Sequence, residues 1–219
     1  MAIFMTGQRI ERATAAWHQA FSGKNVPFVY HLTTVEDGNM SYRYGSEEAV
    51  VANRRKVFSS LGLSAGDVLP LSLDLSHGVH WLDTAPANDG LAVTGFRSEG
   101  LWLAKPAKAL FMFVADCFPI AAFDPISGAL GVFHAGRAEL EAGLLQRFFA
   151  AAVERGLKPK NVRVFIGPGI CPVHYVFQKL PDGHGGASRQ DADGVWHVDL
   201  REDIRLIMKK VGISDNNIV

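Results

Sequence analysis

The stretch DCFPIAAFDPISGALGVFHAGR, from Asp116 to Arg137, decides the fold prediction because it reads as one β-hairpin. Two apolar runs flank the turn sequence DPISG at residues 124–128. Proline presets φ near about −65° and glycine accepts the left-handed conformation, so this order of residues is typical of a turn. Cys117 lies at one end of the predicted hairpin and His134 at the other.

The length of the turn sets the register of the hairpin. If residues 125–128 form a four-residue loop, Pro119 pairs with His134 and Cys117 faces Gly136, because paired numbers have a constant sum. Cys117 and His134 then share one face, diagonally across the strands. A five-residue loop would place them on opposite faces, since side chains alternate along a strand. Pro119 lacks a ladder donor, which leaves an edge strand, a strand start and a bulge as alternatives.

The composition indicates one large domain with a full core. The chain has 219 residues, of which 48% are hydrophobic and 20% charged. Lys plus Arg and Asp plus Glu both number 22, so the net charge of zero gives no support for binding to nucleic acid or to a membrane. We find no secretory signal and no apolar run of about 18 residues that could span a bilayer. We therefore expect a cytoplasmic protein with a single domain over residues 1–219.

The apolar pattern predicts a mixture of helices and strands without an internal repeat, hence one α+β domain. A helix is expected between the N-cap Ser46 and Leu61-Gly62, with Arg54 and Arg55 on its polar side. Further helical patterns cover residues 7–22, 139–155 and 198–211. Strands are expected at residues 28–34, 68–75, 79–82, 90–93, 111–115, 120–123, 130–133 and 162–166.

The strands around the hairpin carry apolar residues on both faces, which predicts a sheet that is covered on both sides. Residues 182–195 are rich in glycine and polar residues and should form a mobile loop. A role for this loop as a lid is the alternative to an exposed variable loop. The two cysteines, Cys117 and Cys171, are expected to be free thiols in a reducing compartment, with a structural role for Cys171.

Cys117 and His134 are weak candidates one at a time, because a buried cysteine or histidine is more often a core residue. Together they converge on one hairpin, and His77 ends another predicted strand that could join the same edge. One thiolate and two imidazoles suit zinc and leave a fourth position for water or substrate. Such an ion lowers the pKa of bound water toward about 7. His80 is left out because strand alternation turns it to the other face.

Several segments resemble, in order, the laccase-domain (YfiH-like) family, from about residue 28 to residue 219. The matching segments are SHG at 76–78, ADCFP at 115–119, FDP at 123–125, HAG at 134–136 and IGPGICP at 166–172. The loop DGNMS at 37–41 and the helical segment at 53–63 fit the more divergent bacterial members. The resemblance implies a four-layer α/β/β/α sandwich with mixed β-sheets.

The resemblance also implies a zinc ion held by His77, Cys117 and His134. The expected function is then that of a zinc-dependent purine nucleoside phosphorylase, which acts on a purine nucleoside and phosphate. Family members are also described as deaminating adenosine and cleaving methylthioadenosine, and some have a role in peptidoglycan editing, which makes hydrolysis of peptidoglycan precursors an alternative. The laccase label implies copper, but none of the eight histidines forms a His-x-His pair, so zinc is preferred over copper.

The chain departs from the family pattern next to the predicted ligands. The family usually reads His-Ala-Gly-Trp-Arg-Gly, whereas residues 134–139 read HAGRAE, so the Trp is absent and Arg137 comes one position early. Family members also carry a final strand and tail after the position that matches Val219. These departures favour, as an alternative to the enzyme, a metal-binding pseudoenzyme or interaction module.

Two arginines are candidate substrate-binding residues. Arg43 and Arg137 are cations near the predicted site, and a guanidinium group suits bidentate contact with phosphate. The alternative for each is a solvated surface charge or a structural ion pair. Asp116 is adjacent to Cys117, but alternation points it to the other face, so no catalytic acid or base is assigned.

Overall fold

The computed structural model describes residues 3–5, 31–73, 78–87, 89–105, 109–182, 184 and 187–219. The α-helices in these ranges are α2 (Glu47–Ser60), α3 (Arg137–Glu141), α4 (Leu144–Glu154) and α5 (Leu200–Lys210), and the 3-10 helices are η1 (Val35–Asp37), η2 (Ala65–Asp67), η3 (Pro159–Asn161) and η4 (Asp215–Asn217). The helix expected at residues 7–22 and the start of the strand expected at residues 28–34 lie outside the described ranges.

The strands form a large mixed sheet and several smaller ones. They are β1 (Ile3–Met5), β2 (His31–Thr33), β3 (Val68–Ser72), β4 (Val79–Leu82), β5 (Phe96–Arg97), β6 (Gly100–Leu103), β7 (Ala109–Phe111), β8 (Phe118–Phe123), β9 (Leu130–Ala135), β10 (Arg163–Ile166), β11 (Val176–Phe177), β12 (Arg189–Gln190) and β13 (Trp196–His197). The large sheet has the order β10-β8-β9-β6-β4, in which only β4 and β6 pair in parallel. The second sheet has the order β5-β3-β7 with parallel pairs.

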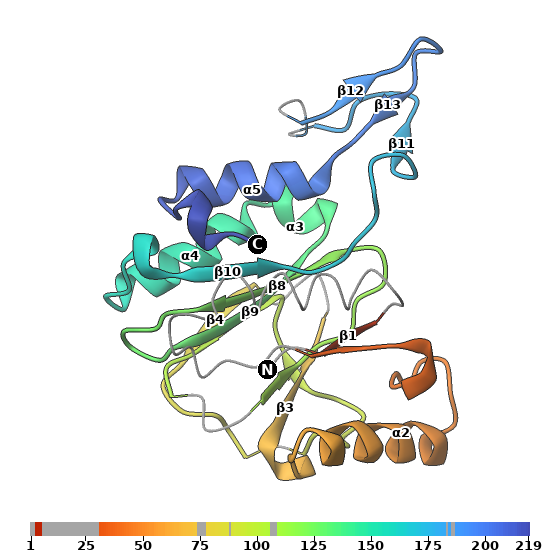
Figure 1. The fold of residues 1–219 in the computed structure, drawn as a ribbon, viewed down its shortest axis with the longest axis vertical. Helices are drawn as coiled ribbons and strands as arrows, with labels where there is room; N and C mark the ends of the chain where they lie inside the picture. The colour runs from red at the N-terminus through yellow and green to blue at the C-terminus, as the bar shows by residue number, and fades with distance from the viewer. Residues whose placement is uncertain are drawn as a thin grey trace.

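Three apolar clusters fill the spaces between four layers. The first, around Phe148, lies between the large sheet and the helices α3, α4 and α5. The second, around Leu101, lies between the two sheets, and the third, around Phe58, lies between β3, β7 and α2. Figure 1 shows α4 and α5 above the large sheet and α2 below the second sheet. The predicted α/β/β/α sandwich with mixed sheets is therefore confirmed.

The large sheet is buried on both faces, as the apolar runs predicted. Neighbouring residues of β6 show this, because Leu101 belongs to the cluster between the sheets while Trp102 belongs to the cluster beneath the helices. The indole nitrogen of Trp102 donates a hydrogen bond to the carbonyl oxygen of Phe148 at 2.9 Å. A buried indole N–H needs such a partner, so this contact ties α4 to the sheet.

The hairpin has the register that the four-residue loop predicted. Pro119 pairs with His134, and the amide of Asp124 donates to the carbonyl of Ala129 at 3.0 Å. The carboxylate of Asp124 accepts hydrogen bonds from the amide and hydroxyl of Ser127, which is how an aspartate closes a turn. Pro119 is the second residue of β8, so the strand-start alternative is the one that the structure adopts.

The expected N-terminal caps of α2 and α5 agree with the structure. The helix expected at residues 139–155 differs from it. The hydroxyl of Ser46 accepts from the amide of Ala49, and the carboxylate of Asp199 accepts from the amide of Glu202. The single helix expected at residues 139–155 is instead two helices, α3 and α4. The break comes at Gly143, whose φ of 67° lies in the left-handed region.

Arg54 was expected on the polar side of its helix, and this prediction is wrong. Its side chain is 1% exposed, and its guanidinium donates to the carbonyl oxygens of Met40, Gly90 and Ala92. The strand predicted at residues 90–93 is also wrong. That segment is a turn, whose carbonyl groups face the buried guanidinium rather than a neighbouring strand.

Two other boundaries are corrected. The strand expected at residues 111–115 ends at Phe111, so residues 112–115 lead to the hairpin without strand pairing. The loop expected at residues 182–195 includes strand β12, which pairs with β13 in a small sheet of order β11-β13-β12. This small sheet projects beyond α5 in Figure 1. Among the described residues, no helix combines the length and the apolar content that crossing a membrane requires.

Candidate metal centre

His134 is the penultimate residue of β9 and is held by a buried glutamate from the loop before β6. Its Nδ1 atom lies 2.8 Å from Oε2 of Glu99, whose side chain is 0% exposed. The backbone amide of His134 also donates to the carbonyl oxygen of Glu99 at 2.8 Å. A carboxylate on one ring nitrogen fixes the orientation of an imidazole and leaves its other nitrogen for a ligand.

Cys117 immediately precedes β8, and its thiol lies near enough to His134 to raise the pKa of the imidazole. The sulfur packs against Gly136, where an added Cβ would lie only 2.8 Å from Sγ. The absence of a side chain at residue 136 therefore makes the room for the sulfur. The structure thus brings together the two residues that the register placed on one face.

The surroundings of His134 favour positive charge. Burial lowers the pKa of its imidazole, but hydrogen bonds with Cys117 and Glu99 and the charges of Cys117 and Glu139 outweigh burial and raise it to about 10. The imidazole side chain is 14% exposed, so these interactions are weakly screened. A site of this kind binds a proton or a metal cation strongly.

Glu139 adds a second buried carboxylate that the sequence did not reveal. Its Oε2 atom accepts from the amide of Gly136 at 3.0 Å, and its Oε1 atom lies 3.8 Å from Nδ1 of His134. Within the described part of the chain, Oε1 of Glu139 and Oε1 of Glu99 are buried without a hydrogen-bond partner. Each unpaired carboxylate oxygen carries a desolvation cost that a nearby cation would offset.

The donor atoms fit a metal ion in two ways. Ligand atoms of Glu99, His134 and Glu139 all lie within 4.8 Å of one another, a nitrogen and oxygen set that suits a hard cation. The thiol of Cys117 with the free ring nitrogen of His134 forms a softer set that suits zinc. Because Glu99 already holds Nδ1 of His134, we favour the second set, with Glu99 as the residue that orients the imidazole.

His77, the third expected ligand, lies outside the described residues, so its role stays a prediction. The next residue in the chain, Gly78, is described. Its carbonyl oxygen accepts from the amides of Glu99 and Gly100 at 3.0 and 3.3 Å. The chain that follows His77 therefore runs beside the glutamate that holds His134.

Arg137 lies on the exposed side of the candidate centre, at the start of α3. Its Nη1 atom lies 2.8 Å from Oε1 of Glu141. The hydrogen bond and the charge of Glu141 raise the pKa of Arg137. Burial is the main cause that raises the pKa of Tyr175, against the lowering effect of Arg137. A cavity of about 440 Å³ opens beside this group.

Arg43, the other expected phosphate-binding residue, lies in the turn before α2. Its guanidinium is 5.4 Å from the ring centroid of Tyr44, and both residues are exposed. Its part in phosphate binding stays a prediction. Asp116 is exposed, and its carbonyl oxygen accepts from the amide of Ile170 at 2.7 Å, which anchors the segment after β10 beside Cys117.

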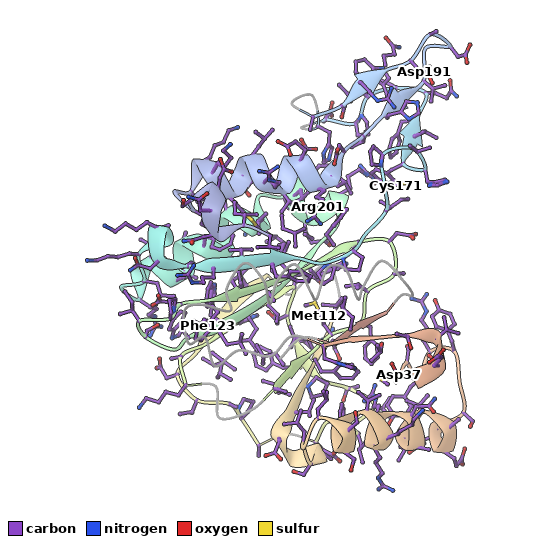
Figure 2. All side chains as sticks on the ribbon, in the orientation of Figure 1. Asp37, Met112, Phe123, Cys171, Asp191 and Arg201 are labelled. Carbon is purple, nitrogen blue, oxygen red and sulfur yellow. The ribbon has the colours of Figure 1, made fainter. Side chains whose placement is uncertain are left out.

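Cys171 follows that anchored segment, on the connection from β10 to β11 (Figure 2). Its sulfur lies 3.0 Å from Nδ1 of His174. The hydrogen bond from His174 is the main cause that lowers the pKa of the Cys171 thiol, and the backbone amides of Val173 and His174 add to it. The chain therefore contains a second cysteine–histidine pair, on the surface.

Known proteins with the same architecture support the fold. YlmD from Geobacillus stearothermophilus superposes with a TM-score of 0.73 at 23% identity, covering 82% of this chain and 72% of that one. A hypothetical protein YfiH of Bacillus licheniformis gives a TM-score of 0.71, also at 23% identity, covering 81% of this chain and 71% of that one.

Sequence relatives carry a functional name. The chain is 29% identical over 176 residues to a purine nucleoside phosphorylase of Corynebacterium glutamicum, which covers 76% of this chain and 69% of that protein. It is 28% identical over 184 residues to a purine nucleoside phosphorylase of Deinococcus radiodurans, covering 81% and 69%. The family model described as multi-copper polyphenol oxidoreductase laccase matches residues 30–219, and the chain therefore belongs to that family.

Proposed function

We propose that the protein is a zinc-dependent purine nucleoside phosphorylase. The observation that carries the proposal is the contact of Cys117 with His134 and the buried Glu99 that orients the imidazole. This arrangement suits a catalytic metal site, because three protein ligands would leave the fourth coordination position open for water or substrate. The names of the sequence relatives in Corynebacterium glutamicum and Deinococcus radiodurans give the substrate class.

Cys117 and His134 would hold the ion, with His77 as the third ligand. When bound there, zinc supplies a Lewis acid that polarises an oxygen of the substrate. Glu99 keeps the ring of His134 in the orientation that leaves its second nitrogen toward Cys117. Removal of Cys117 should therefore release the ion, while the hairpin itself keeps its register.

Phosphorolysis breaks the bond between the ribose C1′ atom and the purine nitrogen and joins C1′ to a phosphate oxygen. The departing purine takes up one proton. Arg137 would hold the phosphate, since its guanidinium is partly exposed and can bind two phosphate oxygens.

The proposal includes two further reactions at the same centre, cleavage of methylthioadenosine and deamination of adenosine. Cleavage of methylthioadenosine is the same reaction with a different 5′ substituent on the ribose. Deamination of adenosine would replace the amino group on C6 by oxygen from water and release ammonia. Both reactions use a purine nucleoside at the site of Cys117 and His134.

The test combines metal analysis with product analysis. Purified protein should contain about one zinc per chain and, with adenosine and phosphate, should yield adenine and ribose 1-phosphate, while inosine reports deamination. Cys117→Ala should lose the metal and at least about 100-fold of the activity. Cys171→Ala is the matched control and should keep both. Turnover that survives Cys117→Ala would exclude the zinc mechanism.

A metal-binding pseudoenzyme or interaction module is the second candidate. The observation in its favour is that Arg137 is already paired with Glu141 and stands where the family usually has a tryptophan. Full occupancy by zinc without turnover of any purine nucleoside would select this alternative.

A further inference from the structure

We propose that the cavity beside α3 is a phosphate subsite, in which Arg137 and Lys179 hold the phosphate group and Glu141 is a counter-ion that it displaces. The inference deepens the proposed function and rests on it for the source of the phosphate, which is inorganic phosphate or the sugar phosphate product. The residues that would bind the phosphate lie in α3 and in the segment that follows β11.

The cavity has the size and the lining for a small phosphorylated ligand. Its volume is about 440 Å³, within the range of about 300 to 1,000 Å³ that is usual for ligand sites. Two cations, Arg137 and Lys179, line it together with the apolar side chains of Phe177 and Leu180. Glu141 and Asp182 also line it, so a phosphate group must lie against the two cations. The apolar wall suits the sugar of an ester.

The pair of Arg137 and Glu141 is open to exchange. The two side chains are 42% and 31% exposed, and their Nη1 and Oε1 atoms lie 2.8 Å apart. An exposed ion pair within one helix contributes little to stability. Phosphate offers two negative charges and bidentate oxygens, so it is a stronger partner for the guanidinium than a single carboxylate.

A buried histidine gives Glu141 a second partner. The side chain of His184 is 2% exposed, and its Nδ1 atom lies 2.7 Å from Oδ2 of Asp203. Its Nε2 atom points toward Glu141, 3.5 Å from Oε1, and has no hydrogen-bond partner in the part of the chain that the structure describes. This separation exceeds the usual range of about 2.7 to 3.2 Å for such a bond.

A short movement of Glu141 would close this gap. The two ring nitrogens of His184 face Asp203 from α5 and Glu141 from α3. Because the same Oε1 atom contacts Arg137 and faces His184, Glu141 would then divide its charge between two partners and hold the guanidinium less tightly. The unpaired buried Nε2 atom is thus the place to which the displaced carboxylate moves.

The subsite lies beside the candidate metal centre. Arg137 comes three residues after His134 in the chain. Burial is the main cause that raises the pKa of Tyr175, and the charges of Arg137, which lowers it, and of Cys117, which raises it, both act on this tyrosine. A phosphate on Arg137 would therefore approach a nucleoside held near Cys117.

Calorimetric titration of the metal-loaded protein with inorganic phosphate and, separately, with ribose 1-phosphate tests the subsite. Arg137→Ala and Lys179→Ala should each weaken binding by about tenfold or more, because each removes a charge-assisted hydrogen bond. Lys158→Ala, an exposed lysine beside η3, is the charge-matched control and should have no effect. Tighter binding of the ester than of inorganic phosphate would identify the apolar wall as the site of the sugar.

Glu141→Gln gives the sharpest result because it should strengthen phosphate binding, whereas the two cation variants should weaken it. Removal of the counter-ion should tighten phosphate binding several-fold, whereas a merely structural glutamate would leave it unchanged or weaken it. Unchanged or weaker binding in Glu141→Gln, or no binding of either ligand by the wild type, would overturn the inference. If phosphate binds with these variant effects but no nucleoside is turned over, the proposed function is refuted and the subsite stands. If nucleoside turnover is unchanged in Arg137→Ala and Lys179→Ala, the subsite is refuted and the proposed function stands.

Discussion

The molecule contains two cysteine–histidine pairs that differ in what surrounds the imidazole. His134 is 14% exposed and lies between the thiol of Cys117 and the buried carboxylate of Glu99. His174 is exposed and follows Cys171 by three residues in a surface turn. Both sulfurs are partly exposed, so the thiols alone do not distinguish the pairs.

The difference shows why one pair suits a metal site and the other does not. His134 lies in β9 and Cys117 immediately precedes the paired strand β8, so the buried hairpin limits how far the two can separate. Carboxylates add negative charge beside a ring that can turn little. The hydrogen bond of Cys171 with His174 instead depends on a short turn, and solvent can replace it. Fixed geometry and buried negative charge, rather than residue type, therefore mark the candidate centre.

Glu99→Gln is expected to have the largest effect on this comparison. The amide keeps the shape of the side chain but removes the negative charge beside His134. Loss of such a partner typically weakens metal binding by about 10- to 100-fold. Zinc affinity measured by competition with a chromophoric chelator would show this loss. Glu202→Gln, on the surface of α5, is the control, and equal affinities in all three proteins would remove Glu99 from the site.

Gly136→Ala should perturb the first pair by a smaller amount. A Cβ atom at this position would lie 2.8 Å from Sγ of Cys117 and 2.5 Å from Oε2 of Glu139. Both contacts are too short, so the two side chains must move at a cost of about 1 kcal/mol in the free energy of unfolding. Denaturant unfolding would measure the cost. Gly66→Ala is the control, because its nearest neighbour would be 3.9 Å away, and equal losses in both variants would contradict this account.

The hairpin could be predicted from the sequence because its signals are local. The turn sequence at residues 124–128 predicted a turn whose length stayed open between four and five residues, and the four-residue alternative gave the observed pairing of Pro119 with His134. A sheet with cover on both faces could be expected because its strands carry apolar residues on both sides, whereas the four layers were implied by the resemblance to the laccase-domain family. Local turn chemistry and periodicity thus predicted the hairpin and the covered sheet, and the resemblance supplied the arrangement of the layers.

The carboxylates beside His134 could not be predicted in the same way. Glu99 belongs to a loop 35 residues away in the chain, and its one signal is a charge directly before the apolar strand β6. Glu139 belongs to the segment where the family pattern is lost. Arg54 was placed wrongly for a related reason, since its partners are backbone carbonyls of distant turns. Partners that tertiary packing supplies leave no periodic pattern in the sequence.

The reactivity of the two thiols gives the smallest of these effects. In zinc-loaded protein, iodoacetamide should modify Cys171 before Cys117, because a metal ligand is protected while an exposed thiolate is the reactive form. His174→Ala should slow the modification of Cys171 by a few-fold, since the imidazole hydrogen bond is the main cause that lowers its pKa. Mass spectrometry of the two cysteine peptides over time would measure both rates. Faster modification of Cys117 would mean that Cys117 and His134 do not hold the metal. The two pairs would then differ only in how exposed they are to solvent.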